Sequence, residues 1–351
     1  MKLLKNELYR NDIEYVANLP LAWEKLEGKV LLICGATGMI GSFLVDLLMY
    51  RNDKFNNNCK VIAMGRNISR LESRFSYYKN DKRFVFISQD INNPILEFGD
   101  VDFIIHAASN THPVAYSTDP IGTLTTNIIG TYNLLNYSVS HKAERFLFVS
   151  SVEIYGENRG DTEKFSEDYL GYIDCNTLRA GYPESKRAGE ALCQAFIKQM
   201  GLDIVIARAS RTYGPTMLKS DTKAISQFIK NGVLKEDIVL KSKGSQYYSY
   251  TYVADCVSGL LTILFKGNCG EAYNIADDNS NISLRDLAKL ISEYAGTSVI
   301  YDKPNNLEKE GYSKATKAVL DSEKLQKMGW KAKYDIEEGV NRTLEILSHA
   351  N

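Results

Sequence analysis

The stretch Lys29-Val-Leu-Leu-Ile-Cys-Gly-Ala-Thr-Gly-Met-Ile-Gly-Ser42 decides the fold of this chain. Its opening residues, 29–34, are mostly apolar and predict a buried strand of a parallel sheet. The residues that follow the stretch, 43–49, predict a helix. A strand, a glycine-rich turn and a helix in this order are typical of the first half of a βαβ unit.

The glycines of this turn have the spacing of a dinucleotide-binding site. Gly35 permits the tight turn, Gly38 lets backbone approach a pyrophosphate, and Gly41 allows the helix to pack closely on the strand. The pyrophosphate would lie at the helix N-terminus, where free N–H groups and the dipole favour an anion. We expect the turn to hold a nucleotide coenzyme through Gly35, Thr37, Gly38, Met39, Ile40 and Gly41. A glycine-rich turn that binds nothing is the alternative.

Strand-like runs alternate with helical stretches through the first half of the chain, which predicts an α/β fold with a Rossmann-type doubly wound parallel sheet. After about residue 208 the pattern loosens and predicts a smaller mixed α/β lobe that binds the substrate. We place the coenzyme-binding domain at 1–207, with a helical cap at 1–27, and the substrate lobe at 208–351. The predicted strands are 29–34, 60–64, 83–87, 102–106, 145–150 and 203–207.

Composition excludes several classes of function. The 351 residues carry 42 basic and 43 acidic side chains, a net charge of −1, and no basic stripe indicates a nucleic-acid partner. No apolar run is long enough to span a membrane, and the charged N-terminus is unlike a secretory signal. The six cysteines form no C-x-x-C motif and no metal-ligand spacing with the four histidines. We expect free thiols, no metal and a cytoplasmic protein.

A second motif, Tyr182-Pro-Glu-Ser-Lys186, lies in a stretch that predicts a helix. Side chains four residues apart project from the same helix face. An ammonium beside a phenol stabilises the phenolate, so we expect the pKa of Tyr182 to fall from about 10 toward neutrality. Such a pair can shuttle a proton when an alcohol is oxidised or a ketone reduced. Taken alone, the motif also fits a solvated helix face.

Together these motifs resemble the extended short-chain dehydrogenase/reductase family, the NAD-dependent epimerases and dehydratases that modify nucleotide sugars. The resemblance covers about residues 29–348, and within the family the chain resembles UDP-glucuronate decarboxylases most. It implies transient oxidation of a nucleotide-diphosphate sugar at C4. It also implies a homodimer formed through the Tyr182 helix and a helix at 124–140. In that second helix, Ile128, Leu134 and Leu135 suit either the dimer face or burial against the sheet. The segments that carry it further are Gln89-Asp-Ile91, His106-Ala-Ala-Ser109, Asp119-Pro120, Asn127-Ile-Ile-Gly-Thr131, Ser150-Ser-Val-Glu-Ile-Tyr-Gly156 and Gly244-Ser-Gln246.

The resemblance also implies roles for particular residues. Ser151 would hydrogen-bond the sugar hydroxyl that Tyr182 deprotonates, and Lys186 would hold the tyrosinate and the nicotinamide ribose. Glu153 would be an acid/base residue that removes the proton at C5 of a 4-keto sugar, although it also suits a polar strand edge. Further coenzyme contacts would come from Arg66, Asp90, Ile91, Ala107, Ala108, Ser109, Asn127, Tyr182 and Lys186, and substrate contacts from Ser109, Arg179, Arg211 and Tyr248.

Three positions depart from the family pattern. Val152 stands where dehydratases place a proton-donating aspartic acid, which disfavours a 4,6-dehydratase. Tyr248 stands where the family usually has an arginine that holds the diphosphate or a sugar carboxylate. Arg211 replaces an asparagine, and it either supplies a relocated anion contact or pairs with a nearby acid. Arg179 could likewise reach a substrate anion or lie on the surface.

The second predicted strand ends in Gly65, where NAD-binding proteins usually present an acid to the ribose. Arg66 follows and could accommodate the 2′-phosphate of NADP. The resemblance implies NAD, so we expect NAD(P) with NAD slightly favoured.

Because Tyr248 removes the expected carboxylate arginine, the sequence favours an NAD(P)-dependent nucleotide-sugar epimerase. One alternative is a UDP-glucuronate decarboxylase. The other is a non-catalytic NAD(P)-sensing protein, which would have no use for Ser151, Glu153, Tyr182 and Lys186 together.

Overall fold

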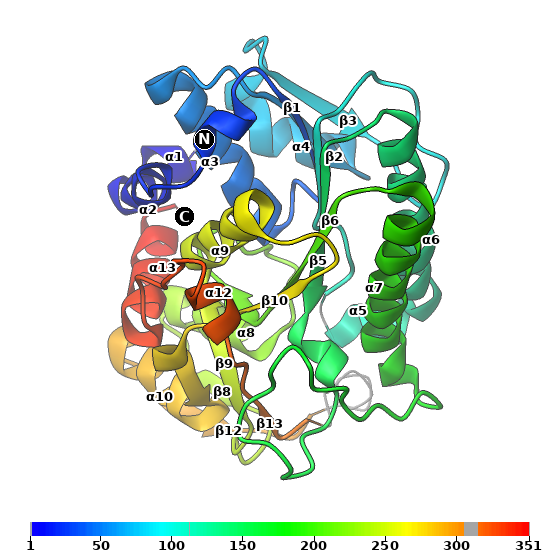
Figure 1. Cartoon of the computed structure of the whole chain (residues 1–351). Helices are drawn as coiled ribbons and strands as arrows, with labels where there is room; N and C mark the ends of the chain where they lie inside the picture. Colours follow the sequence, from blue (N-terminus) through cyan, green and yellow to red (C-terminus); the bar gives the residue numbers. More distant parts are fainter. Residues whose placement is uncertain (1, 112, 305–314, 351) are drawn as a thin grey trace.

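The computed structural model describes residues 2–111, 113–304 and 315–350. Within them, a seven-stranded sheet forms the centre of the molecule, with all strands parallel in the order β3-β2-β1-β4-β5-β6-β10 (Figure 1). The strand order reverses between β1 and β4, which places a ligand crevice at their carboxyl ends. This confirms the predicted doubly wound sheet. Its strands are β1 (Val30–Cys34), β2 (Lys60–Gly65), β3 (Phe84–Ser88), β4 (Phe103–His106), β5 (Arg145–Ser151), β6 (Ile204–Ala209) and β10 (Ala272–Ile275).

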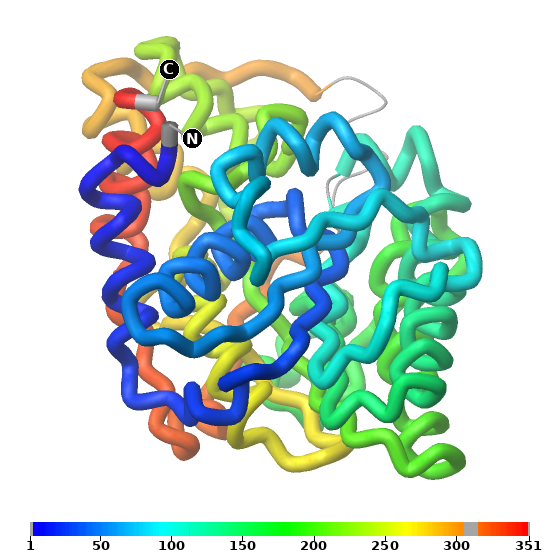
Figure 2. Tube along the Cα trace, turned by 90° about the horizontal axis from the view of Figure 1, so that it is seen from above, coloured from blue at the N-terminus to red at the C-terminus, as the bar shows by residue number. Residues whose placement is uncertain are grey.

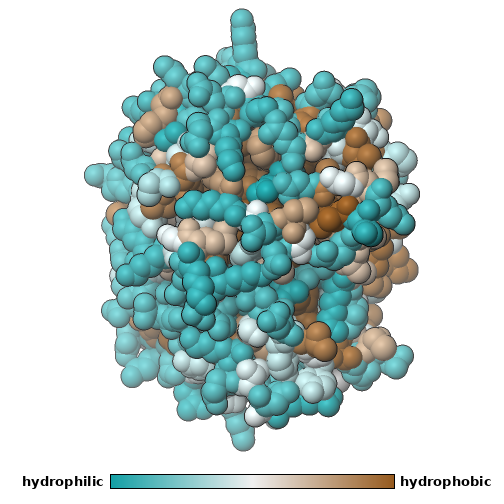
Figure 3. Space-filling view, in the orientation of Figure 1, coloured by the Kyte–Doolittle hydropathy of each residue, from teal (hydrophilic) through white to brown (hydrophobic). Residues whose placement is uncertain are grey.

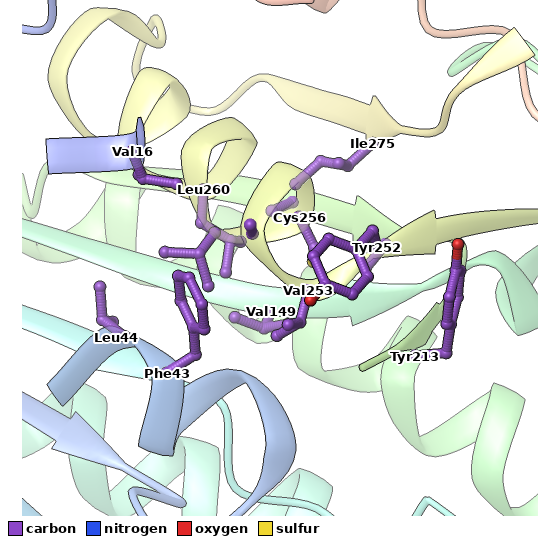
Figure 4. Packing of buried hydrophobic residues seen from close by; sticks show 14 of the residues in the cluster. Val16, Phe43, Leu44, Val149, Tyr213, Tyr252, Val253, Cys256, Leu260 and Ile275 are labelled. Carbon is purple, nitrogen blue, oxygen red and sulfur yellow. The ribbon is translucent and has the colours of Figure 1, made fainter. Parts of the chain in front are cut away.

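Alternate residues of the strands face two different cores, because helices cover both faces of the sheet. Leu31 packs in a cluster with residues of α3 (Met39–Phe55) and α9 (Val253–Lys266). Leu32 packs in the opposite cluster with residues of α6 (Pro120–Ser140) and α7 (Gly181–Met200). Figure 4 shows part of the first of these cores, in which Phe43 and Leu44 of α3 lie near Leu260 of α9, with Val149 of β5 beside them.

The smaller lobe is built around β9 (Tyr247–Tyr252), which pairs with β7, β11 and β13. A separate pair, β8 with β12, lies beside it. These strands are β7 (Arg211–Tyr213), β8 (Ile238–Leu240), β11 (Asn281–Ser283), β12 (Val299–Tyr301) and β13 (Lys317–Ala318). The helices of this lobe are α8 (Ala224–Leu234), α10 (Leu284–Ala295), α12 (Glu323–Gln326) and α13 (Ile336–Ala350).

The chain passes between the two parts more than once. The predicted boundary at residue 207 falls within β6, and β10 returns to the edge of the large sheet after β9. The division into 1–207 and 208–351 therefore stays a prediction. Further described elements after β1 are α4 (Ile68–Phe75), α5 (Pro113–Thr118), η2 (Ser76–Tyr78), η3 (Val152–Tyr155), η4 (Leu178–Ala180) and η5 (Asp278–Ser280).

The N-terminal segment joins both parts. It contains α1 (Lys2–Lys5), α2 (Glu7–Ala17) and η1 (Trp23–Leu26), and α2 runs beside α13 in Figures 1 and 2. The Tyr9 hydroxyl donates to Asp46 of α3 at 2.7 Å. Asp12 accepts hydrogen bonds from Tyr252 and Arg342 of the smaller lobe, both at 2.6 Å. None of the described helices combines the length and the apolar character needed to cross a membrane.

Candidate active site

A cavity of about 770 Å³ lies at the carboxyl ends of the parallel strands and extends to the smaller lobe. Most of the site residues predicted from the sequence line it. They are Gly35, Gly38, Met39, Ile40, Gly41, Ala107, Ser109, Ser151, Glu153, Arg179, Tyr182, Lys186, Arg211 and Tyr248. The predicted residues that do not line it are Thr37, Arg66, Asp90, Ile91, Ala108 and Asn127.

The glycine turn fits a dinucleotide. Gly35 has a φ of +80°, and a Cβ there would lie 2.7 Å from the backbone oxygen of Ala107, which follows the neighbouring strand β4. A Cβ on Gly41 would lie 2.4 Å from the Gly35 oxygen. Gly38 caps α3 without any side-chain hydrogen bond to the first turn. The N–H groups of that turn are therefore available at the cavity for a pyrophosphate.

The predicted coenzyme residues outside the cavity lining have other contacts. The buried Asn127 donates to the Ser185 hydroxyl at 2.9 Å and so ties α6 to α7. The exposed Arg66 donates to Asn110 at 3.2 Å. The atoms nearest to a Cβ on Gly65 would be those of the Leu71 side chain, at 3.6 Å or more, so packing does not require a glycine at the end of β2.

Tyr182 and Lys186 lie buried at the start of α7, and Ser151 ends β5. Burial raises the pKa of Tyr182 to about 12, against a lowering effect of its hydrogen bond with Ser151. Glu153 raises this pKa further and Arg179 lowers it. Burial also lowers the pKa of Lys186 to about 7, and its ammonium donates to the Val149 oxygen at 2.8 Å.

The expected lowering of the Tyr182 pKa by Lys186 is therefore wrong for this fold. Desolvation opposes the charged form of both side chains. The spacing of four residues does bring the two side chains to one cavity, but the ammonium donates its hydrogen bond to the backbone of β5 rather than to the phenol.

A cluster of charges borders this group. Glu153 pairs with Arg179 at 2.6 Å and with Arg211 at 3.1 Å. Burial alone would raise the pKa of Glu153, but the two guanidinium groups outweigh burial and lower it. Glu153 is thus ionised near neutral pH and has no proton to donate there. We name Glu153, Arg179 and Arg211 the arginine clamp.

Tyr248, which replaces the family's arginine, and Arg211, which replaces its asparagine, are in contact in the structure. The Arg211 guanidinium carbon lies 3.5 Å from the centre of the Tyr248 ring. Arg211 Nη1 and Arg179 Nε are buried without a hydrogen-bond partner among the described residues. The clamp therefore satisfies the pairing expected of a salt bridge and leaves two buried donors unpaired among the described residues.

Sequence reasoning missed Tyr116 of α5. Its ring stacks on Tyr182 with centroids 5.0 Å apart and planes inclined by 27°. No motif marks Tyr116 in the sequence, because α5 and α7 are brought together only by the fold.

A doubly wound parallel sheet, a glycine turn after its first strand, and a serine, a tyrosine and a lysine at its carboxyl edge define an extended short-chain dehydrogenase/reductase. The chain belongs to the NAD dependent epimerase/dehydratase family, whose sequence profile matches residues 31–276. This is a family of enzymes, and the alternative of a non-catalytic sensor finds no support.

Relatives in sequence are similar over most of their length. UDP-glucuronic acid decarboxylase 1 of Xenopus tropicalis is 30% identical over 323 residues, covering 90% of this chain and 71% of its own. UDP-glucuronic acid decarboxylase 3 of Arabidopsis thaliana is 30% identical over 310 residues, covering 88% and 86%.

Solved structures share the fold. The DesIV double mutant, a dTDP-glucose 4,6-dehydratase from Streptomyces venezuelae with NAD bound, has a TM-score of 0.78 at 24% identity and covers 90% of this chain and 96% of its own. UDP-glucuronic acid 4-epimerase from Bacillus cereus, in complex with UDP-glucuronic acid and NAD, has a TM-score of 0.77 at 23% identity and covers 92% and 100%.

Proposed function

We propose that this enzyme oxidises a nucleotide-diphosphate sugar at C4, with epimerisation as the leading outcome. The observation that carries the proposal is that Ser151, Tyr182 and Lys186 line the same cavity as the glycine turn. The family and its UDP-sugar relatives support a nucleotide-sugar substrate.

Each residue has a defined task in this proposal. The Ser151 hydroxyl orients the sugar C4 hydroxyl, and the Tyr182 phenolate oxygen accepts its proton. The bound coenzyme supplies the acceptor for the hydride that leaves C4 and, when oxidised, a positive charge in the cavity. Burial leaves the Tyr182 phenol protonated near pH 7, so added positive charge is needed to bring its pKa down. Lys186, with a pKa of about 7, can exchange a proton at working pH.

The arginine clamp favours a second candidate, the decarboxylation of a sugar uronate such as UDP-glucuronate. The absence of an arginine at position 248 argued against a carboxylate substrate. Arg211 lines the cavity and its guanidinium lies over the Tyr248 ring, so this part of the cavity has an arginine although position 248 does not. Arginine pairs well with carboxylates through parallel N–H bonds.

The test is to incubate the enzyme and coenzyme with UDP-glucose and with UDP-glucuronate and to analyse the products by mass spectrometry for mass and by NMR for configuration. Epimerisation leaves the mass unchanged and inverts one carbon, whereas decarboxylation removes the mass of carbon dioxide. Wild-type protein that alters neither sugar, nor any GDP-, CDP- or dTDP-sugar, would contradict the proposed function. The Tyr182→Phe variant is the matched inactive control.

For the coenzyme we propose NAD(P), with NAD slightly favoured. Support for NAD comes from the contact of Arg66 with Asn110, which engages the arginine that would otherwise receive a 2′-phosphate. The missing acid at Gly65 favours NADP. Titrating both coenzymes into the protein decides between them: tighter binding of NADP would overturn the preference.

A homodimer and a cytoplasmic location also stay proposals. Leu134 and Leu135 are buried against the sheet, so a dimer face on α6 would instead use its exposed side chains, Ile121, Ile129 and Tyr132. Apolar side chains gather on the edge of Figure 3 toward which α6 and α7 lie. The six free cysteines suit a reducing compartment. Sedimentation of the protein tests the dimer.

A further inference from the structure

Tyr116 occupies an unusual place beside the proposed catalytic tyrosine. It belongs to the short helix α5, is 5% exposed and lines the cavity. One face of its ring lies against Tyr182, with centroids 5.0 Å apart. The stacked ring packs against the phenol and so restricts the rotation of Tyr182.

The Tyr116 ring also contacts the arginine clamp. The guanidinium carbon of Arg179 lies 4.6 Å from the ring centre, and Arg179 in turn pairs with Glu153. Tyr182, Tyr116, Arg179 and Glu153 therefore form one continuous row of contacts. The row connects the phenol at the start of α7 with the charges of Arg179 in η4 and Glu153 in η3.

We infer that Tyr116 is a positioning residue: its ring holds the Tyr182 phenol toward Ser151 and joins it to the arginine clamp. The inference rests on the proposed function only in taking Tyr182 as the proton acceptor. The planar ring is the part of Tyr116 that acts, because its contacts with Tyr182 and Arg179 both use the ring. Among the described residues, no hydrogen bond of its hydroxyl is seen.

Two variants separate the role of the Tyr116 ring from the role of its hydroxyl. Tyr116→Phe keeps the ring, and Tyr116→Leu replaces it with a flexible apolar group. Tyr294→Leu, on α10 and 44% exposed, is the matched control for losing a tyrosine. Single-turnover coenzyme reduction is measured with UDP-glucuronate and UDP-glucose, together with coenzyme affinity and thermal unfolding.

We expect Tyr116→Phe to stay within threefold of wild type and Tyr116→Leu to slow coenzyme reduction at least tenfold, with coenzyme affinity within twofold. Tyr294→Leu should match wild type. Equal rates for Tyr116→Leu and wild type, or an equal loss in Tyr116→Phe, would overturn the role of the ring. Tyr116→Met, another flexible apolar replacement, takes the place of the leucine variant if that protein does not fold.

A crystal structure of the leucine variant gives a readout that does not require turnover. The inference predicts that Tyr182 leaves Ser151 in that variant and keeps its place in Tyr116→Phe. An unmoved Tyr182 in the leucine variant would overturn the inference even if the enzyme is active. A wild-type protein that reduces no coenzyme with any sugar would instead count against the proposed function.

Discussion

Replacing Glu153 with glutamine should destabilise the fold, because it removes the shared counter-ion of two guanidinium groups. The Glu153 carboxylate lies 2.6 Å from Arg179 and 3.1 Å from Arg211. Glutamine preserves the shape of the side chain but carries no charge. Arg179 and Arg211 would then repel each other from positions that are largely buried.

The magnitude follows from the burial of the three side chains. Removing one partner of a buried ion pair typically costs about 3–5 kcal/mol. The side chains of the clamp are 13%, 16% and 18% exposed, so some screening remains and we expect about 3 kcal/mol, at the lower end of that range. In a chain of 351 residues the loss corresponds to a fall in Tm of roughly 4 °C.

The pH dependence has a definite sign. The pKa of Glu153 is lower in the folded protein than its usual value. Its contribution to stability is therefore complete above the unfolded-state pKa of about 4.3, and it is lost as pH falls through the lower folded value. The difference in stability between wild type and Glu153→Gln should be constant from neutral pH down to about 5 and shrink below about pH 4.

The assay is urea unfolding of both proteins across this pH range. Glu163→Gln is the matched control, because Glu163 pairs with Lys317 but its side chain is 93% exposed; it should leave stability unchanged. Equal stability of wild type and Glu153→Gln at pH 7, or a difference that grows in acid, would refute the reasoning.

Three other substitutions test separate parts of the structure. Gly35→Ala should weaken coenzyme binding at least tenfold in a fluorescence titration, because its Cβ would lie 2.7 Å from the Ala107 oxygen; unchanged binding would remove the glycine turn from the coenzyme site. Asp12→Ala should lower the free energy of unfolding by about 3 kcal/mol, since it leaves the largely buried Arg342 unpaired and cuts the contact of α2 with Tyr252; a loss of less than about 1 kcal/mol in urea unfolding would show that this contact is only a surface interaction. Arg211→Ala should raise the dissociation constant of UDP-glucuronate at least tenfold, about 1.4 kcal/mol, and leave that of UDP-glucose within threefold; equal effects on both sugars would exclude a carboxylate contact.

The sequence was sufficient wherever local pattern determines structure. The glycine turn after β1 needs only neighbouring residues, and Gly35 and Gly41 each prove to be in a place where a side chain would collide with backbone. The helix that carries Tyr182 and Lys186 follows from local periodicity, and both side chains line the cavity. These features depend on short-range sterics and spacing, which the sequence contains directly.

The sequence was insufficient where the site depends on distant contacts. Glu153 and Arg211 lie 58 residues apart, and only the pairing of β7 with β9 places Arg211 beside Tyr248. The sequence could suggest a relocated arginine but could not give its partners. The stack of Tyr116 on Tyr182 has the same origin.

The prediction that the pKa of Tyr182 is lowered was wrong for a different reason. Spacing along a helix indicates that two side chains are neighbours, but it does not measure how strongly burial opposes their charges. In this fold desolvation is the largest effect on both Tyr182 and Lys186.

The most direct test of the central claim is a crystal structure of the protein with its nicotinamide coenzyme. The account predicts the pyrophosphate at the N-terminus of α3 and the nicotinamide ring in the cavity beside Tyr182 and Lys186, with room left for a hexose. A coenzyme bound elsewhere, or a Tyr182 phenol turned away from the nicotinamide, would contradict it.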